Sequence, residues 1–323
     1  MYNSRKGTGK MKHILLASCC LILTGALTGC SNEDDSLNEQ ELAFVPLDDG
    51  TYAVSVGNAT ELEHIKVPKS YKKKAVTKIA VDGFSKCKKL ISVDLPDSLI
   101  TIGDNAFKEC SSLNNVKFGK KVNEIGKWAF AYCSSLETIN LADSVSKIDD
   151  AAFYNSGLKS ITLPNNLNYV GREVFVASSL SSTEYEDEKK LSGSRYFNSK
   201  DNPFLYFCGA WSYSDSITYC EINDKCRVLG EKSLLLTNNR LKTIVIPKSV
   251  VFIGWNVTYN ASGLFTPENI FYKGSQEDWN NDVKIGGNNT VFLSKPIFYY
   301  SETKPSSNGN YWHYNGKIPT KWN

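Results

Sequence analysis

Histidine is scarce in this sequence, and the motifs that build common catalytic and metal sites are absent. The chain of 323 residues contains three histidines, of which His64 and His313 lie outside the N-terminal apolar region. No CxxC, HExxH or GxSxG stretch occurs. Zinc needs about four ligands at close spacing. We therefore predict no metal, no cofactor and no catalytic residue, and we do not expect an enzyme.

The apolar run near the N-terminus is too short to span a membrane. Such a helix needs about 20 apolar residues, whereas the run from Ile14 to Leu27 has 14. The residues before it are basic and include no acid; the basic ones are Arg5, Lys6, Lys10 and Lys12. A charged region, a short apolar run and small residues before a cut site are typical of an export signal.

A strong excess of one charge is missing as well. The chain has 37 Lys and Arg against 34 Asp and Glu. Removing the four basic residues of the export signal leaves 37 − 4 = 33 against 34. A nearly neutral chain has no basic field for a polyanion. We predict no nucleic-acid partner.

The residues that end the apolar run predict an anchor. Leu27-Thr28-Gly29-Cys30 resembles the bacterial lipobox, which implies a signal peptide over residues 1–29 and lipidation of Cys30. The following SNEDDS resembles the acidic signal that directs lipoproteins of the Bacteroidetes to the cell exterior. This resemblance implies an acidic tether over residues 30–46 and an outer-membrane protein that touches the membrane only through its N-terminal lipid.

Phenylalanine recurs at a fixed interval. Phe84, Phe107, Phe130, Phe153 and Phe175 are separated by 23, 23, 23 and 22 residues. Each is preceded by an apolar pattern such as Leu90, Val93, Leu95 and Pro96, whose alternating apolar residues predict a short strand. A unit of this length cannot bury its own apolar face, so it must stack on its neighbours. The period therefore predicts a solenoid.

These residues resemble the BspA-like, or type 5, leucine-rich repeat family of bacterial surface proteins, whose units read close to LxxIxLPxxVxxIGxxAFxxCxxL. The resemblance implies a β-dominated repeat solenoid of the α/β leucine-rich-repeat type, a right-handed stack of about eight coils. It places the N-terminal cap and first repeats in residues 47–180 and further repeats in residues 217–280. Residues 281–323 look like a terminal segment that covers the open end of the stack, which also makes Trp312 and His313 less attractive as site residues.

The repeat pattern lapses between these two blocks. Residues 181–216 are too long for an ordinary connection and too aromatic for a disordered linker. Their short aromatic runs predict a strand-rich insertion packed on the edge of the solenoid. The aromatic side chains of this insertion are an alternative contact surface.

The cysteines of the repeats predict packing. Cys87, Cys110 and Cys133 recur at intervals of 23 residues and so occupy equivalent sites on successive turns. Stacked equivalent side chains run parallel instead of converging, which disfavours a disulfide although export exposes them to an oxidising compartment. We predict buried thiols that act as small apolar groups.

The residues between the inward positions of the strands are the binding candidates. They face solvent on the concave sheet that stacked units form. The candidates are His64, Lys66, Ser92, Asp94, Asn115, Lys117, Thr138, Asn140, Ser160, Thr162, Tyr219 and Glu221, followed by Thr243 and Val245. Their mixed polarity predicts a protein or glycan ligand, and the family resemblance implies adhesion. A structural envelope lipoprotein without a dedicated ligand and a glycan-handling accessory protein remain as alternatives.

Overall fold

A computed structural model describes residues 41–180, 183–185, 194–210, 219–234, 242–258 and 267–322. The chain divides into two units, residues 1–33 and 34–323, and every described residue belongs to the second. The predicted signal peptide and Cys30 lie outside the described residues. Among the helices of the described part, none has the length and apolar character that crossing a membrane requires.

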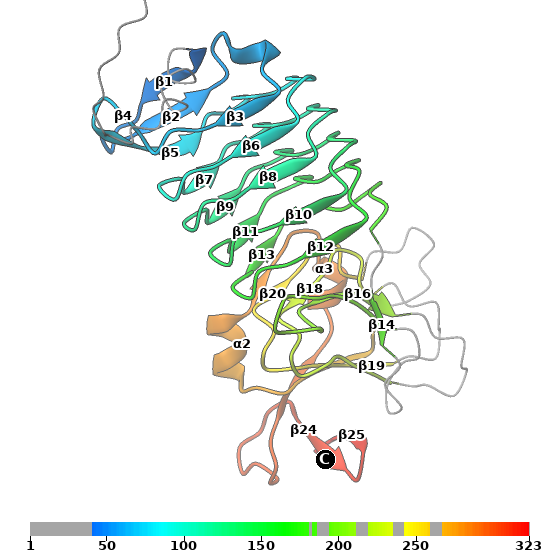
Figure 1. The fold of residues 1–323 in the computed structure, drawn as a ribbon. Coiled ribbons are helices and arrows are strands. Elements are labelled where there is room, and N and C mark those ends of the chain that lie inside the picture. The colour runs from blue at the N-terminus through cyan, green and yellow to red at the C-terminus, as the bar shows by residue number, and fades with distance from the viewer. Residues whose placement is uncertain are drawn as a thin grey trace, which may run out of the picture. The chain divides into compact units, whose positions relative to one another are not determined.

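Each turn of the solenoid contributes one strand to a sheet that we call the front sheet (Figure 1). The middle residue of each front strand points inward and is buried, as Val93 and Val116 are. Ile65, Val93 and Val116 pair in parallel register, and so do Ile139 and Ile161. In the N-terminal half the front strands are β3 (His64–Lys66), β6 (Ser92–Asp94), β8 (Asn115–Lys117), β10 (Thr138–Asn140) and β12 (Ser160–Thr162).

The same turns form a second parallel sheet, which we call the rear sheet. Its short strands end at the isoleucine that precedes the glycine of the repeat pattern. Its inward residues, such as Ile102 and Ile125, are fully buried. Gly103 is needed here because a Cβ at this position would lie 2.6 Å from the carbonyl oxygen of Ile79 in the preceding turn. The rear strands of the N-terminal half are β5 (Lys74–Ile79), β7 (Thr101–Ile102), β9 (Glu124–Ile125), β11 (Lys147–Ile148) and β13 (Tyr169–Val170).

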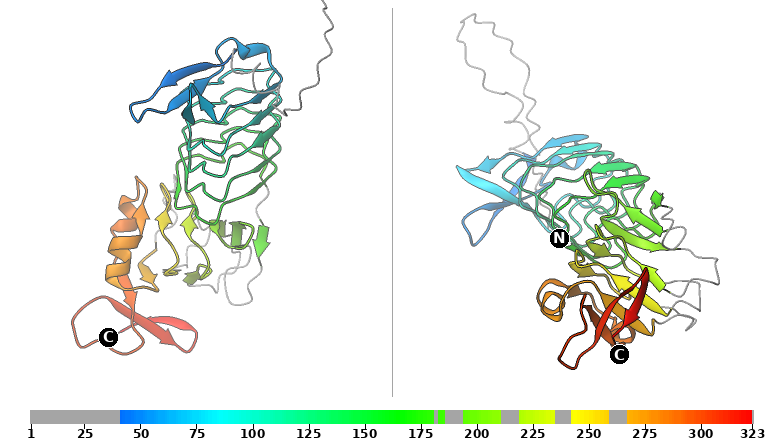
Figure 2. Two further views of the ribbon diagram at one scale, coloured as in Figure 1. Left: turned by 60° about the vertical axis from the view of Figure 1, so that its left-hand side comes forward. Right: turned by 90° about the horizontal axis from the view of Figure 1, so that it is seen from below.

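The recurring phenylalanines form a continuous stack inside the turns. Figure 2 shows the ribbon of these turns from two further directions. Successive ring centroids from Phe84 to Phe175 lie 5.4, 5.2, 5.5 and 6.0 Å apart, with ring planes within 9° of each other. The backbone follows the same spacing, since the Phe107 amide donates to the Ala129 carbonyl. Stacked aromatic pairs contribute about 0.5–1.5 kcal/mol each beyond their burial. The 23-residue period is therefore a packing period.

The N-terminal end of the fold begins earlier than the sequence predicts. β1 (Ala43–Pro46) pairs antiparallel with β2 (Tyr52–Ser55), which pairs with β5. Phe44 of β1 stacks on Tyr71, with ring centroids 4.0 Å apart. The tether predicted to reach residue 46 is therefore too long, because β1 supplies an apolar residue to the end of the stack. The short elements here are η1 (Ala59–Glu61) and β4 (Ser70–Tyr71).

The described part of the predicted insertion contains a repeat turn. β14 (Thr183–Tyr185), β15 (Ser194–Phe197) and β16 (Tyr206–Ala210) are antiparallel neighbours, and β16 then pairs in parallel with β18 (Val228–Leu229) of the rear sheet. Phe207 is fully buried at the position that Ile102 takes in an ordinary turn. Aromatic residues replace the aliphatic ones of the repeat pattern, so the pattern did not identify this turn. The prediction of a separate insertion packed on the edge is wrong for residues 198–210.

The C-terminal half forms its own front and rear sheets, which are not paired with β12 and β13. Its front strands are β17 (Tyr219–Glu221), β19 (Thr243–Ile246), β21 (Asn269–Tyr272) and β23 (Ile297–Tyr300), and its rear strands after β18 are β20 (Phe252–Ile253) and β22 (Lys284–Ile285). Two helices follow β21 and β22: α2 (Gln276–Asp282), which begins with a Ser275–Asp278 capping box, and α3 (Thr290–Leu293). The last strands are β24 (Tyr311–Asn315) and β25 (Ile318–Lys321). Because β22 and β23 extend the sheets, the repeats run past the predicted boundary at residue 280.

Candidate binding site

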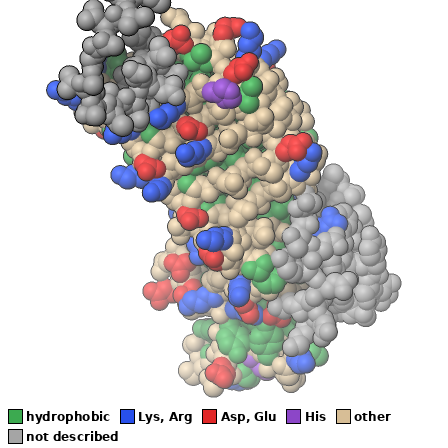
Figure 3. All heavy atoms as spheres, in the orientation of Figure 1, with side chains coloured by type: hydrophobic (Ala, Val, Ile, Leu, Met, Phe, Trp, Pro, Cys, Tyr) green, Lys and Arg blue, Asp and Glu red, His purple; other side chains and the backbone are tan. Residues whose placement is uncertain are grey.

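The front sheet between β3 and β12 presents its predicted binding residues to solvent. His64, Lys66, Asn115, Lys117, Thr138, Asn140, Ser160 and Thr162 are exposed, and Ser92 and Asp94 are half-buried. Side-chain contacts on this face join neighbouring strands. The His64 Nδ1 and Ser92 Oγ atoms lie 2.7 Å apart, and the Lys117 Nζ and Asp94 Oδ2 atoms lie 4.0 Å apart. Acidic and basic side chains are interspersed over the face drawn in Figure 3, so it offers no field of one sign.

The C-terminal half of the front sheet is covered by the hairpin of β24 and β25. Trp312 of β24 is fully buried; its ring stacks on Phe271 at a centroid distance of 5.0 Å, and its Nε1–H donates to the Tyr272 carbonyl at 2.9 Å. Val245, which the sequence places among the solvent-facing residues, is 0% exposed in the same cluster. The sequence predicted that the terminal segment covers the end of the stack. β24 does pair with β23, the last front strand of the turns, and the segment covers a face of the sheet as well.

The hairpin also covers Tyr219 and Glu221, which the sequence predicts as ligand contacts. The Tyr219 hydroxyl donates to the Lys317 carbonyl at 3.3 Å. The Tyr314 hydroxyl donates to the Glu221 Oε1 atom at 3.0 Å, and the Glu221 side chain is only 12% exposed. The prediction that these two residues face an external ligand is wrong, because the chain's own C-terminus occupies that position.

A partly exposed ion-pair network contacts the hairpin through Tyr314. The Lys273 Nζ atom lies 2.7 Å from Glu221 Oε1 and 2.6 Å from Asp224 Oδ1. Burial acts to lower the pKa of Lys273, but the bonds to Asp224 and Glu221 outweigh it and raise the pKa above the ordinary value. Burial, and then the Glu221 charge, raise the pKa of Tyr314, so its hydroxyl stays protonated and donates to Glu221. The Lys273 ammonium is thus shared between two carboxylates.

In the N-terminal half, the front sheet is interrupted between β8 and β10. Elsewhere the first residue of a front strand donates its amide hydrogen to a carbonyl of the preceding turn; such bonds join Ser92 to Glu63, Asn115 to Ile91 and Ser160 to Glu137. Within the described chain no equivalent bond joins Thr138 to Asn114, and the sheet divides into β3-β6-β8 and β10-β12. The rear sheet is unbroken through the same turns, since β9 pairs with β11. Backbone polar groups therefore line the facing edges of β8 and β10.

Side-chain size explains where the sheet opens. The residue that follows a front strand is a buried leucine in two of these turns, Leu95 after β6 and Leu163 after β12. After β8 this position holds the larger Phe118, which is only half-buried and packs against Phe130 at a centroid distance of 6.4 Å. The next residue, Gly119, approaches the preceding turn so closely that a Cβ would lie 2.0 Å from the Pro96 carbonyl oxygen. The turn after β8 thus packs closely against the preceding turn.

The interruption leaves a hollow of about 450 Å³ on the front sheet. We call it the β8/β10 hollow. Binding pockets for small ligands commonly measure about 300–1,000 Å³. Polar and apolar groups both line it, and the residues are Asn115, Val116, Lys117, Phe118, Asn140, Leu141, Ala142 and Asp143. Three of these, Asn115, Lys117 and Asn140, are predicted binding residues that the structure brings to one place.

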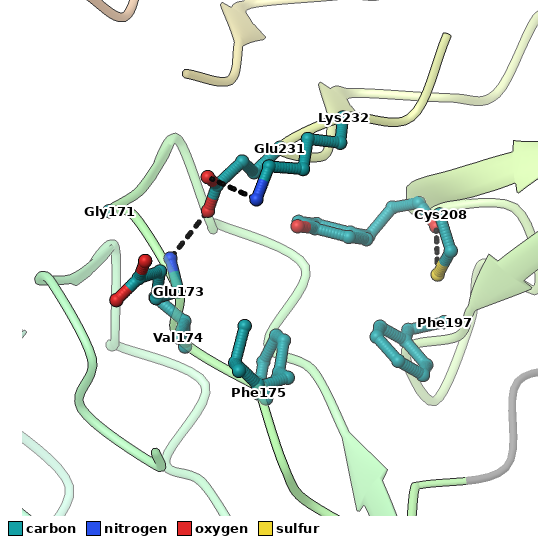
Figure 4. Close-up of a pocket in the computed structure, with 10 residues that line it drawn as sticks. Gly171, Glu173, Val174, Phe175, Phe197, Cys208, Glu231 and Lys232 are labelled. Atoms are coloured by element: carbon teal, nitrogen blue, oxygen red, sulfur yellow. Dashed lines mark hydrogen bonds and ion pairs between the residues drawn. The ribbon is translucent and has the colours of Figure 1, made fainter. Parts of the chain in front are cut away.

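A second cavity, of about 220 Å³, lies at the seam between the turns of β13 and β16 (Figure 4). Its polar groups already bind one another. The Glu231 Oε2 atom accepts from the Glu173 amide at 2.6 Å, and Glu231 Oε1 lies 3.6 Å from the Lys232 Nζ atom. The remaining wall is aromatic, with Phe175 edge-on to Tyr206 at 6.2 Å. This cavity joins two parts of the core and is a weaker candidate site.

The repeat cysteines lie inside the stack. The thiol of Cys110 donates to the Phe84 carbonyl at 3.0 Å, and that of Cys133 donates to the Phe107 carbonyl at 3.1 Å. Burial raises the pKa of Cys133 to about 12, so the reactive thiolate is disfavoured. The six cysteines of the described residues are free thiols. Over the same residues, no three side chains of His, Cys, Asp or Glu gather as a metal site would need.

Comparison with known protein families assigns the repeats. Residues 77–202 match the family described as "BspA type Leucine rich repeat region", in six copies. Residues 77–202 are a BspA-type leucine-rich repeat region. The repeat family expected from the sequence is confirmed, as is the solenoid, and the match ends at residue 202, before β16 of the aromatic turn. No curated protein matches the chain.

Several solved structures are similar to this chain at low identity. A leucine-rich repeat protein from Bacteroides ovatus is 21% identical, with a TM-score of 0.43, over 81% of this chain and 72% of that one. The Treponema pallidum leucine-rich repeat protein is 18% identical, with a TM-score of 0.42, over 72% of this chain and 83% of that one. A leucine-rich cell surface protein from Faecalibacterium prausnitzii is 18% identical, with a TM-score of 0.29, over 75% and 96%.

The sequence did not single out Phe118, Leu141 or Asp143 as site residues. Phe118 and Gly119 stand where the family pattern has Leu and Pro, and that departure was the available signal. This departure identifies an unusual turn, but it does not predict the opening between β8 and β10, because the width of that opening depends on how two successive turns pack.

Proposed function

We propose that this protein is a binding module that holds a protein or glycan ligand on the front sheet between β3 and β12. One contrast supports the proposal. The solvent-facing residues of β3 to β12 are exposed, whereas those of β17 to β21 are covered by the β24–β25 hairpin. An exposed, extended sheet with polar side chains suits contact with a large ligand.

The charge of this surface favours a neutral or mixed partner. Lys117 is already matched by Asp94 across the strands, and the exposed pair is worth at most about 1 kcal/mol. The other exposed residues include Thr138, Asn140 and Thr162, which carry hydroxyl and amide groups. Such groups both donate and accept hydrogen bonds. A protein or glycan partner is therefore favoured over a polyanion, and adhesion is the biological role that this surface would serve.

We also propose that the module is displayed on the cell surface by a lipid on Cys30, in the outer membrane and facing the exterior. The lipobox and the acidic SNEDDS stretch support this location. A Cys30→Ser variant is expected to leave the membrane fraction and to lose incorporation of labelled palmitate. Retention of the variant in the membrane with unchanged labelling contradicts the anchor.

The binding proposal is tested with the chain lacking residues 1–30 on an array of glycans and extracellular-matrix proteins. A double variant, Thr138→Arg and Ser160→Arg, places two large charges on the front sheet. The matched control carries Val81→Arg and Ile100→Arg, two exposed positions beside the rear sheet, with exposed fractions of 55% and 47%. We expect the first variant to lose binding and the control to keep it.

The alternative is a structural envelope lipoprotein without a dedicated ligand. Absence of binding to every member of the array by a folded chain favours that alternative. Equal loss of binding in both double variants contradicts the assignment of the site to the front sheet.

A further inference from the structure

Three polar side chains that line the β8/β10 hollow have no side-chain hydrogen-bond partner in the described chain. The amides of Asn115 and Asn140 and the carboxylate of Asp143 make no side-chain hydrogen bond to any described residue. Each amide offers two donors and an acceptor, and the carboxylate offers only acceptors. A ligand that both donates and accepts at closely spaced atoms matches this set, as neighbouring sugar hydroxyls do.

An apolar wall accompanies these polar groups. Phe118 and Leu141 are half-buried, although the equivalent Leu95 and Leu163 are 5% and 1% exposed. The break between β8 and β10 uncovers this apolar surface inside the hollow. Small-ligand sites typically combine such a wall with a few placed polar groups. A pyranose ring has the same division, with C–H groups on its faces and hydroxyls around its rim.

The charges of the hollow favour a neutral ligand. Lys117 is the one cation among its lining residues, and its ammonium lies 4.0 Å from the Asp94 carboxylate. Asp143, on the opposite wall, would repel a sulfate, phosphate or carboxylate group. An anionic glycan would thus meet one shared cation and one opposing anion.

The geometry disfavours an extended peptide in the same place. A peptide strand between β8 and β10 requires their separation to grow from about 4.8 Å to about 9.6 Å. The pairing of β9 with β11 holds the same two turns together at the rear sheet. A sugar ring can lie against the opening without separating the turns.

We infer that the β8/β10 hollow binds a neutral carbohydrate of one or two rings, with Asn115, Asn140 and Asp143 bonded to its hydroxyls and Phe118 against its apolar face. This inference rests on the proposed function and names its ligand class. The backbone groups along the broken edge supply further donors and acceptors.

The test uses a panel of neutral hexose and N-acetylhexosamine disaccharides titrated into the chain lacking residues 1–30. Binding is followed by calorimetry and by NMR shifts of the asparagine side-chain amides. We expect at least one disaccharide to bind and to shift Asn115 and Asn140. Asn140→Ala and Asp143→Ala should each weaken binding by about tenfold, the effect of losing one or two hydrogen bonds to a ligand.

Two matched controls keep the test specific. Val81→Arg and Ile100→Arg change exposed positions beside the rear sheet, outside the hollow, and should change affinity by less than twofold. Thermal unfolding of all four variants checks that each is folded. Phe118→Leu should also weaken binding while preserving the fold, because leucine is the residue at the equivalent positions.

The outcomes separate this inference from the proposed function. If a matrix protein binds and the front-sheet double variant abolishes that binding, but no neutral disaccharide binds, the inference fails and the proposed function stands. A disaccharide that binds equally well to Asn140→Ala and Asp143→Ala also overturns the inference. Preference for sulfated or sialylated glycans, or for an extended peptide, overturns the assigned ligand class. Absence of any binding overturns both.

Discussion

Removing the Trp312 side chain should release the C-terminal hairpin from the front sheet. Trp312 is the largest fully buried side chain in the described part of the chain. It joins the hairpin to β21 through its stack on Phe271 and through the bond from its Nε1–H to the Tyr272 carbonyl. β24 also pairs with β23, but only at Tyr311 and Trp312, and a two-stranded hairpin is at best marginally stable alone. The anchoring contacts therefore decide whether it stays closed.

The size of the effect follows from burial. Truncating a buried tryptophan to alanine costs about 3–5 kcal/mol. Each 1.4 kcal/mol changes an equilibrium constant tenfold, so opening of the hairpin should become more frequent by roughly 100- to 3,000-fold. The remaining Tyr314–Glu221 bond lies beside Trp312 on the same strand, with the two ring centroids 4.9 Å apart, but it is a polar contact and does not replace the lost apolar one.

Hydrogen exchange measures this opening directly. The Ser301 amide donates to the Trp312 carbonyl and the Trp322 amide donates to the Tyr311 carbonyl, so both report on the hairpin. We expect their exchange in Trp312→Ala to accelerate by at least about 100-fold, while β9 and β11 amides keep wild-type rates. The matched control is Trp322→Ala, a half-buried tryptophan of the same segment, which should have a smaller effect. Unchanged exchange at Ser301 in Trp312→Ala would refute the anchoring role.

Four further results are expected. Phe130→Ala should lower the free energy of unfolding by about 3–5 kcal/mol in denaturant titrations, because the ring is fully buried in the stack; a loss under 1 kcal/mol contradicts the stack as a stabilising core. Gly119→Ala should lower it by about 1–3 kcal/mol, since the added Cβ overlaps the Pro96 carbonyl, and an unchanged melting temperature would show that the turn can move freely. Hydrogen bonds from the Ser275 backbone, and then Lys248, lower the pKa of Asp278 from 3.8 to about 2. The folded state thus binds fewer protons than the unfolded state, so the free energy of unfolding falls as the pH drops from about 4 to about 2. Asp278→Asn should flatten that part of the curve of unfolding free energy against pH. Thiol reagents at pH 8 should leave Cys110 and Cys133 unmodified until the chain unfolds, because both are buried and their pKa values are raised; labelling of the native protein would contradict their burial.

The repeat and its register were predictable because they depend on local periodicity. Phe84 to Phe175 recur at nearly constant intervals, and equivalent residues on successive turns must stack when strands pair in parallel. Val93 and Val116 accordingly lie in register on neighbouring strands. The same reasoning failed between residues 198 and 210, because Tyr206 and Phe207 occupy positions that the pattern reserves for smaller residues.

The candidate site was only partly predictable. The sequence identified Asn115, Lys117 and Asn140 as solvent-facing, since alternate residues of a strand point to opposite faces. It did not predict that these three line one hollow. The hollow exists because Phe118 and Gly119 change how the turn after β8 packs on its neighbours, and such a shift depends on side-chain volumes in several turns at once.

The sequence alone determined that this protein is a stacked solenoid of 23-residue units, because each unit repeats the pattern that buries its neighbour. The tertiary structure decided which part of the front sheet is open. Tyr219 contacts the hairpin at Lys317, 98 residues away, and no periodic pattern encodes a contact between a repeat and a segment outside the repeats. The break between β8 and β10 is likewise a balance between neighbouring turns, so it emerges only when the turns are packed together.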